Sequence, residues 1–389
     1  MSQKTMELYI HIPFCVKKCQ YCDFLSFAAD EATQAAYVEA LLREIAYYGP
    51  HCSDYLVSTV YIGGGTPSWL TEEWMAQIMS AVRRSFRLAS DAEISIECNP
   101  GTVTDHKFAG YRNAGINRIS IGLQSAVDEE LKILGRIHTF DQFLKTYELA
   151  RKNGFDNVNV DIMSSLPGQT AESFARTLQQ LLWLKPEHIS AYSLIIEKGT
   201  PFYDLYKFDA VKQQAGMQTV ALPTEDEVYR MTKLTEQVLA EAGYVHYEVS
   251  NFAKPGYACR HNIGYWEREN YLGLGLGAAS LLGKERFSNT SDMQEYLKNS
   301  SAPEKIRKNR ELLTREDEMA EFMFLGLRMT QGVSKKEFQE YFGTAIENIY
   351  GEVLKKYKKQ GLLLEESGRI FLSREGVHVS NAVMADFLL

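Results

Sequence analysis

Three cysteines close together carry the most distinctive chemistry in this sequence. Cys15, Cys19 and Cys22 follow the spacing Cys-x-x-x-Cys-x-x-Cys, at the end of the apolar run 7–14. Three thiolates on such a short loop can converge on one [4Fe–4S] cluster and leave one iron without a protein ligand. An open metal position can bind a small molecule. A zinc site with His11 as fourth ligand and a set of free thiols are the alternatives, and the spacing alone leaves all three open.

The elements that must position these cysteines are strands that alternate with helices. Apolar runs predict six strands, at 7–14, 58–65, 92–100, 118–125, 157–168 and 188–196. Segments of helical periodicity lie between them, at 31–48, 71–86, 104–114, 140–153 and 171–184. Strands separated by helices indicate parallel pairing with right-handed crossovers, either in a barrel or in a doubly wound sheet.

Polar and glycine residues gather where those strands end. Residues 63–66, Glu97, Gln124 and Asp161 each fall at or near the end of a predicted strand, as Cys15 does. In barrels and doubly wound sheets, chemistry gathers at the carboxyl ends of the strands. The placement therefore predicts an enzyme-like pocket, although each of these residues taken singly is equally typical of a turn or a strand end.

The second half of the chain is less regular. A helix at 224–242, a strand at 244–252 and a loop at 254–266 precede a polar stretch, 298–311, that is typical of a linker. Further helices are predicted at 314–329, 334–342 and 345–360, then a hairpin at 361–376 and a helix at 377–388. Helices followed by a hairpin resemble a winged-helix module, for which DNA binding is one hypothesis and packing or partner binding the other.

The composition is that of a globular chain with a large core. The chain has 389 residues, of which 45% are hydrophobic and 24% charged, and this excludes a disordered chain. Its 42 basic and 50 acidic residues give a net charge of -8, which argues against a general polyanion-binding surface. We recognise neither a signal peptide nor an apolar run long enough to span a bilayer, and therefore expect a cytoplasmic protein. Clustered thiols in a reducing compartment indicate metal binding or catalysis.

The cysteine segment and five further motifs give the sequence a family resemblance. The run YIHIPFCVKKCQYCDF (9–24) is similar to the signature of radical S-adenosylmethionine (SAM) proteins, and more narrowly to the oxygen-independent coproporphyrinogen III oxidase family. GGGTPS, IECNPG, SIGLQS, GRIHT and VDIMSSLPGQT follow in order between residues 63 and 170. The resemblance implies an α/β fold, a partial (βα)6 TIM-type barrel of radical SAM type with a C-terminal winged-helix-like α+β module. The expected parts are a barrel (1–215), a connecting region (216–300) and a C-terminal domain (301–389).

The resemblance also implies cofactors and the residues that hold them. Cys15, Cys19 and Cys22 would hold a [4Fe–4S] cluster, and SAM would chelate its open iron. The positions expected at the SAM site are Tyr9, Phe24, Gly64, Gly65, Thr66, Glu97, Gln124, Arg136 and Asp161. Arg136 would pair with a carboxylate, and Asp161 would accept hydrogen bonds from a ribose or an amine. No catalytic residue is assigned by the match.

Two departures separate this sequence from the decarboxylating members of the family. Those members carry a fourth cysteine two residues after the third, where this chain has Phe24. They also have an extension ahead of the first barrel strand, for which residues 1–6 leave almost no room. Both departures weaken the transfer of the coproporphyrinogen activity, whereas the three cluster cysteines are retained.

A second motif points to haem. The sequence RHNIGYW, which begins at Arg260, is similar to the HNxxYW motif of the HemW branch, regarded as haem chaperones. An imidazole can ligate haem iron, so His261 would bind haem, with Tyr265 and Trp266 against the porphyrin. Arg260 would contact a propionate, and Cys259 is a candidate auxiliary ligand. The alternative is a hydrogen-bonded loop histidine beside aromatic residues that pack two parts of the chain together.

We therefore expect a haem chaperone on a radical SAM scaffold, with a [4Fe–4S] cluster, SAM and haem as its cofactors. The partners that this implies are haem-accepting apoproteins, respiratory ones among them. A homodimer is left open, and nucleic acid is not expected. The alternative is an oxygen-independent coproporphyrinogen III oxidase, which would decarboxylate porphyrinogen propionates by radical chemistry. Whether the chain is an enzyme stays open between these two hypotheses.

Overall fold

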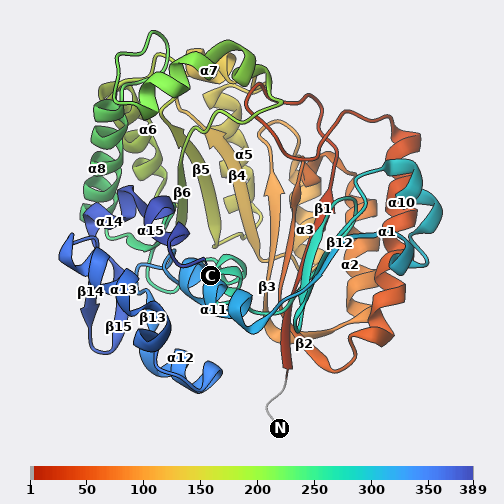
Figure 1. Cartoon of the computed structure of the whole chain (residues 1–389). Coiled ribbons are helices and arrows are strands. Elements are labelled where there is room, and N and C mark those ends of the chain that lie inside the picture. The colour runs from red at the N-terminus through yellow and green to blue at the C-terminus, as the bar shows by residue number, and fades with distance from the viewer. Residues whose placement is uncertain (1–3, 389) are drawn as a thin grey trace.

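A sheet of twelve strands curves around the centre of the molecule (Figure 1). The computed structural model describes residues 4–388. Six neighbouring strands of the sheet are parallel and lie in the order of the sequence. They are β1 (Lys4–Ile12), β2 (Tyr55–Gly64), β3 (Arg87–Cys98), β4 (Arg118–Gln124), β5 (Val158–Ser164) and β6 (His188–Ser193). The predicted α/β fold with parallel strands at these positions is confirmed.

Helices cover the outer face of these strands (Figure 1). They are α1 (Glu31–His51), α2 (Glu72–Ser85), α3 (Asp105–Asn113), α4 (Asp128–Ile133), α5 (Phe140–Lys152) and α6 (Ala171–Leu184). In α2 the buried positions include Met75, Ile78 and Val82, the spacing that places apolar side chains on one helical face. The helix begins where Thr71 accepts a hydrogen bond from the backbone of Trp74. Each helix thus buries one stripe against the sheet and leaves the barrel interior to the strands.

The sheet continues beyond the barrel strands on both sides. β9 (Tyr271–Leu274) pairs parallel with β1, and β10 (Ala279–Leu282), β11 (Glu285–Asn289) and β12 (Arg307–Leu312) follow antiparallel. On the other side β8 (Asn251–Ala253) pairs antiparallel with β6, and β7 (Val245–Glu248) forms the edge. Short helical segments complete this part: η1 (Pro67–Trp69), α7 (Pro201–Gln214), α8 (Glu225–Glu241), α9 (Arg260–Trp266), α10 (Met293–Asn299) and η2 (Pro303–Lys305).

Two predictions about these segments are wrong. The stretch 298–311 is not a linker, because β12 lies within and just beyond it and pairs with β11. Its residues are mostly exposed, as is usual for an edge strand, and a polar edge strand looks like a linker in the sequence. The stretch 244–252 is not one strand either. It turns back on itself between β7 and β8, where the Glu248 carboxylate accepts a hydrogen bond from the backbone of Ser250 at 3.0 Å.

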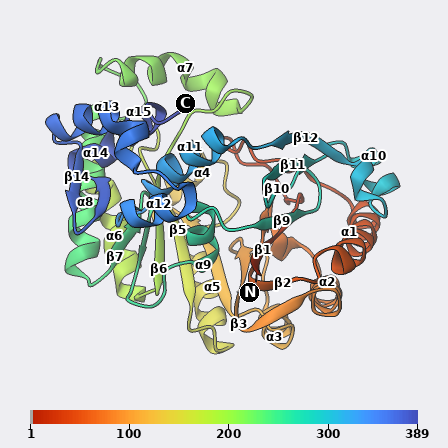
Figure 2. The same ribbon diagram turned by 60° about the horizontal axis from the view of Figure 1, so that its bottom comes forward.

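A small α+β module ends the chain. Its elements are α11 (Arg315–Gly326), β13 (Val333–Ser334), α12 (Lys335–Phe342), α13 (Ile346–Lys359), β14 (Leu363–Glu366), β15 (Arg369–Leu372), α14 (Arg374–His378) and α15 (Ser380–Ala385). The module has a hydrophobic core of its own and lies on the α8 side of the sheet in both views (Figure 2). The large sheet takes strands from all three predicted parts of the chain, so that division stays a prediction. None of the helices within residues 4–388 combines the length and apolar character that a membrane crossing needs.

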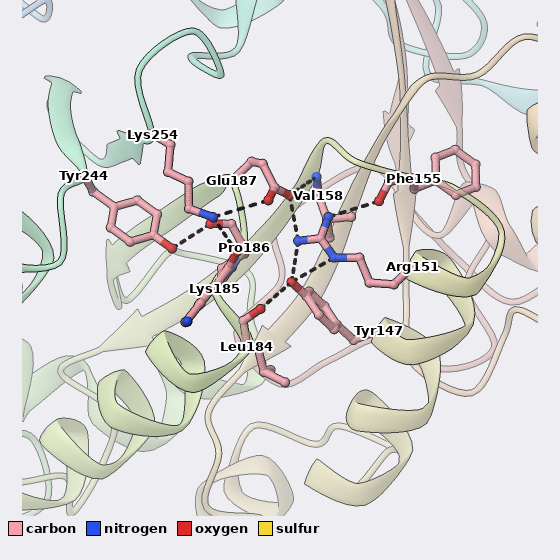
Figure 3. A network of polar contacts seen from close by, with 10 residues as sticks. All are labelled: Tyr147, Arg151, Phe155, Val158, Leu184, Lys185, Pro186, Glu187, Tyr244 and Lys254. Carbon is pink, nitrogen blue, oxygen red and sulfur yellow. Dashed lines mark hydrogen bonds and ion pairs between the residues drawn. The ribbon is translucent and has the colours of Figure 1, made fainter.

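A polar network ties the amino ends of β5 and β6 to the segment that leads into α9 (Figure 3). The Glu187 carboxylate accepts from Arg151 at 2.7 Å and from the backbone of Val158 at 3.2 Å. Lys254, which follows β8, reaches the same carboxylate at 3.3 Å and the carbonyl of Lys185 at 2.6 Å. Glu187 therefore fixes both the start of β5 and the chain that follows β8.

We expect the substitution Glu187→Ala to destabilise the protein by about 1–3 kcal/mol, because it leaves the half-buried donors of Arg151 and Val158 without their acceptor. Urea denaturation followed by circular dichroism measures this. Lys152→Ala is the matched control on the same helix. Lys152 pairs with Asp105, but both side chains are more than half exposed, so its loss should cost no more than about 0.5 kcal/mol. Equal effects of the two substitutions would contradict the role given to Glu187.

Candidate functional site

A cavity of about 330 Å³ begins at the carboxyl ends of the barrel strands and continues down inside the barrel. Its walls include Gln124, the last residue of β4, and Arg118, the first. Most of the predicted cluster and SAM residues meet there: Cys15, Cys19, Cys22, Phe24, Gly64, Gly65, Thr66, Glu97, Gln124, Arg136 and Asp161. The structure thus brings together residues from the cysteine loop and from the ends of four strands, as parallel pairing requires.

The cysteine loop sits at the upper rim of this cavity. Cys15 is buried, while Cys19 and Cys22 are half-buried. The hydroxyl of Thr66 donates to the sulfur of Cys15 at 3.4 Å, and the Arg136 guanidinium donates to the sulfur of Cys19 at 3.7 Å. Burial raises the pKa of the Cys22 thiol. Hydroxyl and guanidinium donors around the sulfurs suit thiolates that are bound to a metal.

His11 does not face the cysteines. One of its ring nitrogens, Nδ1, lies 3.0 Å from the hydroxyl of Tyr9, and the other, Nε2, lies 2.9 Å from the carbonyl oxygen of Leu25. Tyr9 is therefore turned to His11 and is not part of the cavity wall. Within residues 4–388, no three His, Cys, Asp or Glu side chains are arranged to hold a single metal ion. His11 is a hydrogen-bonded packing residue in this arrangement, which does not favour the zinc interpretation.

The glycines that end β2 are required by packing as well as by the cavity. Gly64 has φ +113°, and a Cβ there would lie 2.5 Å from the imidazole of His11. A Cβ on Gly65 would lie 2.8 Å from the carbonyl oxygen of Phe14. Side chains at these positions would push β2 away from the cysteine loop. The absence of side chains also leaves the backbone N–H of Gly64 free to donate to the Glu97 carboxylate at 3.1 Å.

Two carboxyl groups point into the middle of the cavity. Glu97 accepts from the hydroxyl of Tyr61 at 3.0 Å, and Asp161 accepts from Ser120 at 3.1 Å and from Asn159 at 2.8 Å. Burial, followed by the charge of Asp161, raises the pKa of Glu97 to about 7. Burial also raises the pKa of Asp161, against the hydrogen bonds that it accepts. Both groups are strong hydrogen-bond acceptors for a ligand that carries hydroxyl or amino groups.

Gln124 and Arg136 occupy the opposite wall. Gln124 has φ +69°, a left-handed conformation that is uncommon for a residue with a side chain and that often marks a functional site. Arg136 donates to the side chain of Asn99 and to the carbonyl of Gly122, both at 2.8 Å. Together with its contact to Cys19, these bonds make Arg136 a bridge between the strand ends and the cysteine loop. The sequence predicted only a carboxylate partner for it.

Phe24 lies at the mouth of the cavity. Its ring is 64% exposed, and its carbonyl accepts a hydrogen bond from Lys18 at 2.8 Å. At the position where the decarboxylating relatives carry a cysteine, this chain therefore presents an aromatic ring to solvent and to the cavity.

The residue predicted to ligate haem lies elsewhere. His261 is on α9, is only 1% exposed, and has both ring nitrogens engaged. Nδ1 lies 2.7 Å from the hydroxyl of Thr59, and Nε2 lies 3.1 Å from the hydroxyl of Tyr265. The ring stacks on Tyr61 with 5.1 Å between centroids. Burial lowers the pKa of His261 to about 3, so the imidazole is neutral.

Two carboxyl groups of the barrel hold α9 in place. Glu93 of β3 accepts hydrogen bonds from the thiol of Cys259 and from the backbone of Arg260 and His261, at 3.2–3.4 Å. Gly264 packs directly on Glu7, and a Cβ at Gly264 would clash with that carboxyl group. Burial raises the pKa of Glu7 to about 9, which keeps it neutral. The helix thus closes the lower end of the barrel, with polar contacts to strands far away in the sequence.

The remaining residues of the motif face different surroundings. Trp266 lies under the Arg328 guanidinium at 4.3 Å and lines a second cavity, of about 470 Å³, between α9 and the C-terminal module. Tyr265 packs edge-on against Tyr271, and Arg260 pairs with Asp91 at 3.2 Å. The predicted haem residues therefore do not share one surface in this conformation. Their role in haem binding stays a prediction.

Three residues of the central cavity were missed in the sequence: Tyr61, Arg118 and Asn262. Tyr61 had a usable signal, because it lies two residues before Gly63 and so faces the same side of β2. Arg118 is buried at the start of its strand, and residues near the amino ends of strands were not considered. Asn262 belongs to the motif that we assigned to haem, and nothing in the sequence placed it in this cavity.

Comparison with known proteins places the chain. The family model of the Radical SAM superfamily matches residues 9–181, and that of the HemN C-terminal domain matches residues 313–379. The Heme chaperone HemW of Lactococcus lactis subsp. lactis (strain IL1403) is 36% identical over 389 residues, 100% of this chain and 99% of that protein. The chain belongs to the HemW family. The Heme chaperone HemW of Escherichia coli (strain K12) is 37% identical over 382 residues, 95% of this chain and 96% of that protein.

The fold of this HemW-family chain is shared with a solved enzyme. The structure described as coproporphyrinogen III oxidase (HemN) from Escherichia coli, a radical SAM enzyme, superposes with a TM-score of 0.84. It covers 99% of this chain and 90% of that one at 24% identity, which shows a common fold. The predicted resemblance to the radical SAM family and its HemW branch is confirmed.

The cysteines of this HemW-family chain should differ sharply in reactivity when no cluster is bound. Burial raises the pKa of Cys52 to about 11 and of Cys259 to about 12, so neither should alkylate readily at pH 8. Cys19 and Cys22 are partly exposed and should react at least about tenfold faster than these two. Timed iodoacetamide labelling with peptide mass spectrometry measures the order. Equal labelling of Cys259 and the loop cysteines would contradict the packing described for α9.

Proposed function

We propose that this chain is a haem chaperone that binds haem and passes it to an acceptor apoprotein, on a scaffold that carries a [4Fe–4S] cluster and SAM. The observation that carries the proposal is similarity along the whole chain, barrel and C-terminal module alike, to proteins named Heme chaperone HemW. The acceptors are apoproteins that need haem, respiratory ones among them. A cytoplasmic location and a homodimer remain predictions.

The rim of the central cavity fits a cluster. Cys15, Cys19 and Cys22 come from one loop and line one cavity, with the donors of Thr66 and Arg136 beside their sulfurs. These three cysteines would hold the cluster. When bound, a [4Fe–4S] cluster supplies one-electron chemistry and one iron that has no protein ligand.

The walls below the rim fit SAM. Gly64 and Gly65 leave room for the backbone to approach the amino-acid end of the ligand, and Thr66 lies beside them. Gln124 and Arg136 supply donors for a carboxylate. Tyr9 would act through His11, and Phe24 would cover the mouth of the cavity.

Two carboxyl groups complete the SAM site. Glu97 and Asp161 accept hydrogen bonds from hydroxyl or amino groups. Since both are buried, each would replace water around a polar group of the ligand and so orient it.

Binding of SAM should depend on pH through Glu97. With a pKa of about 7, this group is mostly protonated at pH 6 and mostly ionised at pH 8. An ionised carboxylate is the better acceptor, so SAM affinity should rise roughly five- to tenfold between these pH values. Anaerobic calorimetry on the cluster-loaded protein measures this, and Glu97→Gln should flatten the dependence. The control is Glu44→Gln, since burial raises the pKa of Glu44 to about 7 as well, but Glu44 lies outside the cavity. A wild-type slope that persists in Glu97→Gln would contradict the assignment.

Haem binding through the HNxxYW motif requires α9 to leave its position. Both nitrogens of His261 are occupied, and the ring is enclosed by Thr59, Tyr61 and Tyr265. Once released, the neutral imidazole is a competent iron ligand, and Tyr265 and Trp266 offer flat rings to a porphyrin. The packed helix is then the haem-free state of the motif.

A haem titration tests this function. Wild-type protein should bind haem with a defined stoichiometry and a Soret band, whereas His261→Ala should lose that band or shift it. His106→Ala is the matched control, because His106 is exposed and distant from the motif, and it should behave as wild type. Failure of the wild type to bind haem would refute the chaperone function. Wild-type spectra from His261→Ala would refute only the role of the motif.

Decarboxylation of coproporphyrinogen is the second candidate. It rests on the shared fold with HemN, and at 24% identity that likeness reaches no further than the fold. Phe24 stands where the decarboxylating relatives carry a cysteine, so the site itself adds no support.

A further inference from the structure

The central cavity and the HNxxYW helix share a wall, and this has a consequence that rests on the proposed function. We propose that Asn262 and Tyr61 are part of the SAM site, so that α9 is its floor and SAM binding holds His261 inside the barrel. The two motifs of the sequence, one for SAM and one for haem, then act on the same helix from opposite directions.

Asn262 reaches the cavity from below. Successive residues of an α-helix point about 100° apart, so Asn262 can face the cavity while its neighbour His261 faces Thr59 and Tyr265. Its side-chain amide makes no hydrogen bond to any residue between 4 and 388. A half-buried amide at a cavity wall, with its donor and acceptor both unused by the protein, is available to a ligand. Ribose or purine groups of SAM have the matching polarity.

Tyr61 joins the floor to the carboxyl group that we assign to SAM. Its hydroxyl donates to Glu97 at 3.0 Å, and the face of its ring stacks on His261 at 5.1 Å, with 21° between the ring planes. The same side chain therefore fixes the position of Glu97 above and of the imidazole below. Any ligand that holds Glu97 in place also holds Tyr61, and with it the surface against which His261 packs.

Opening the floor removes these contacts together. If α9 leaves, Asn262 is withdrawn from the cavity and Tyr61 loses its stacking partner, so SAM is held less well. By linkage, SAM must then favour the closed floor by the same factor. Tyr61 is thus a positioning residue, whereas Asn262 touches the ligand.

Hydrogen–deuterium exchange of α9 tests the proposal on the cluster-loaded full chain. Saturating SAM should slow exchange in the peptide 259–269 by at least about fivefold, the lower end of ordinary coupling, and should leave the outer helix α2 unchanged. The wild-type comparison decides the main claim without any variant. Binding is checked in parallel by calorimetry.

Three variants separate the contacts. Asn262→Ala, or Asn262→Ser if the first variant is unstable, should bind SAM more weakly and reduce the protection of α9 to less than about twofold. Tyr61→Phe keeps the stacked ring but loses the donor to Glu97, so it should give intermediate protection. Tyr265→Phe is the control: it loses a hydroxyl on the far side of His261 and should keep the full SAM effect.

The outcomes distinguish the inference from the function beneath it. If SAM binds the wild type and the exchange of α9 does not change, the floor is not coupled to the cavity and the inference is wrong, while the SAM site stands. If SAM does not bind the cluster-loaded wild type, the proposed SAM site fails as well, and the inference falls with it.

Discussion

Polar groups enclosed in the barrel must find partners there, because water cannot satisfy them, and this constraint organises the lower half of the molecule. Glu7 and Glu93 come from two strands, and α9 meets both of them. His261 completes the set with its bonds to Thr59 and Tyr265. Because burial keeps Glu7 and His261 neutral, the contact between them is a packed pair of uncharged groups and not an ion pair. A charge introduced here would be costly, which favours a helix that stays closed until something replaces its contacts.

The same constraint explains what could be predicted from the sequence. Parallel strands are buried on both faces and leave apolar runs, so their positions and those of the helices between them follow from local pattern. Residues at the carboxyl ends of such strands must converge, and the cysteine loop, Glu97 and Asp161 do so. The family motifs added which of them belong to a cluster or to SAM.

What could not be predicted depends on contacts between distant segments. β12 is an exposed edge strand whose polar residues resemble a linker, and it is defined only by its pairing with β11. Thr59 and His261 are 202 residues apart, so no local pattern reveals that the haem motif is packed inside the barrel. For the same reason Asn262 was assigned to haem by its neighbours in the sequence, although the fold turns its side chain toward the SAM cavity.

A chaperone must hold haem and then release it, and a shared wall between two ligand sites offers a physical means of doing so. The haem affinity of the cluster-loaded full chain, measured with and without saturating SAM, tests this account most directly. Competition for α9 predicts that SAM weakens haem binding by at least about fivefold. Equal haem affinities in the two conditions, with SAM shown to be bound, would contradict the account.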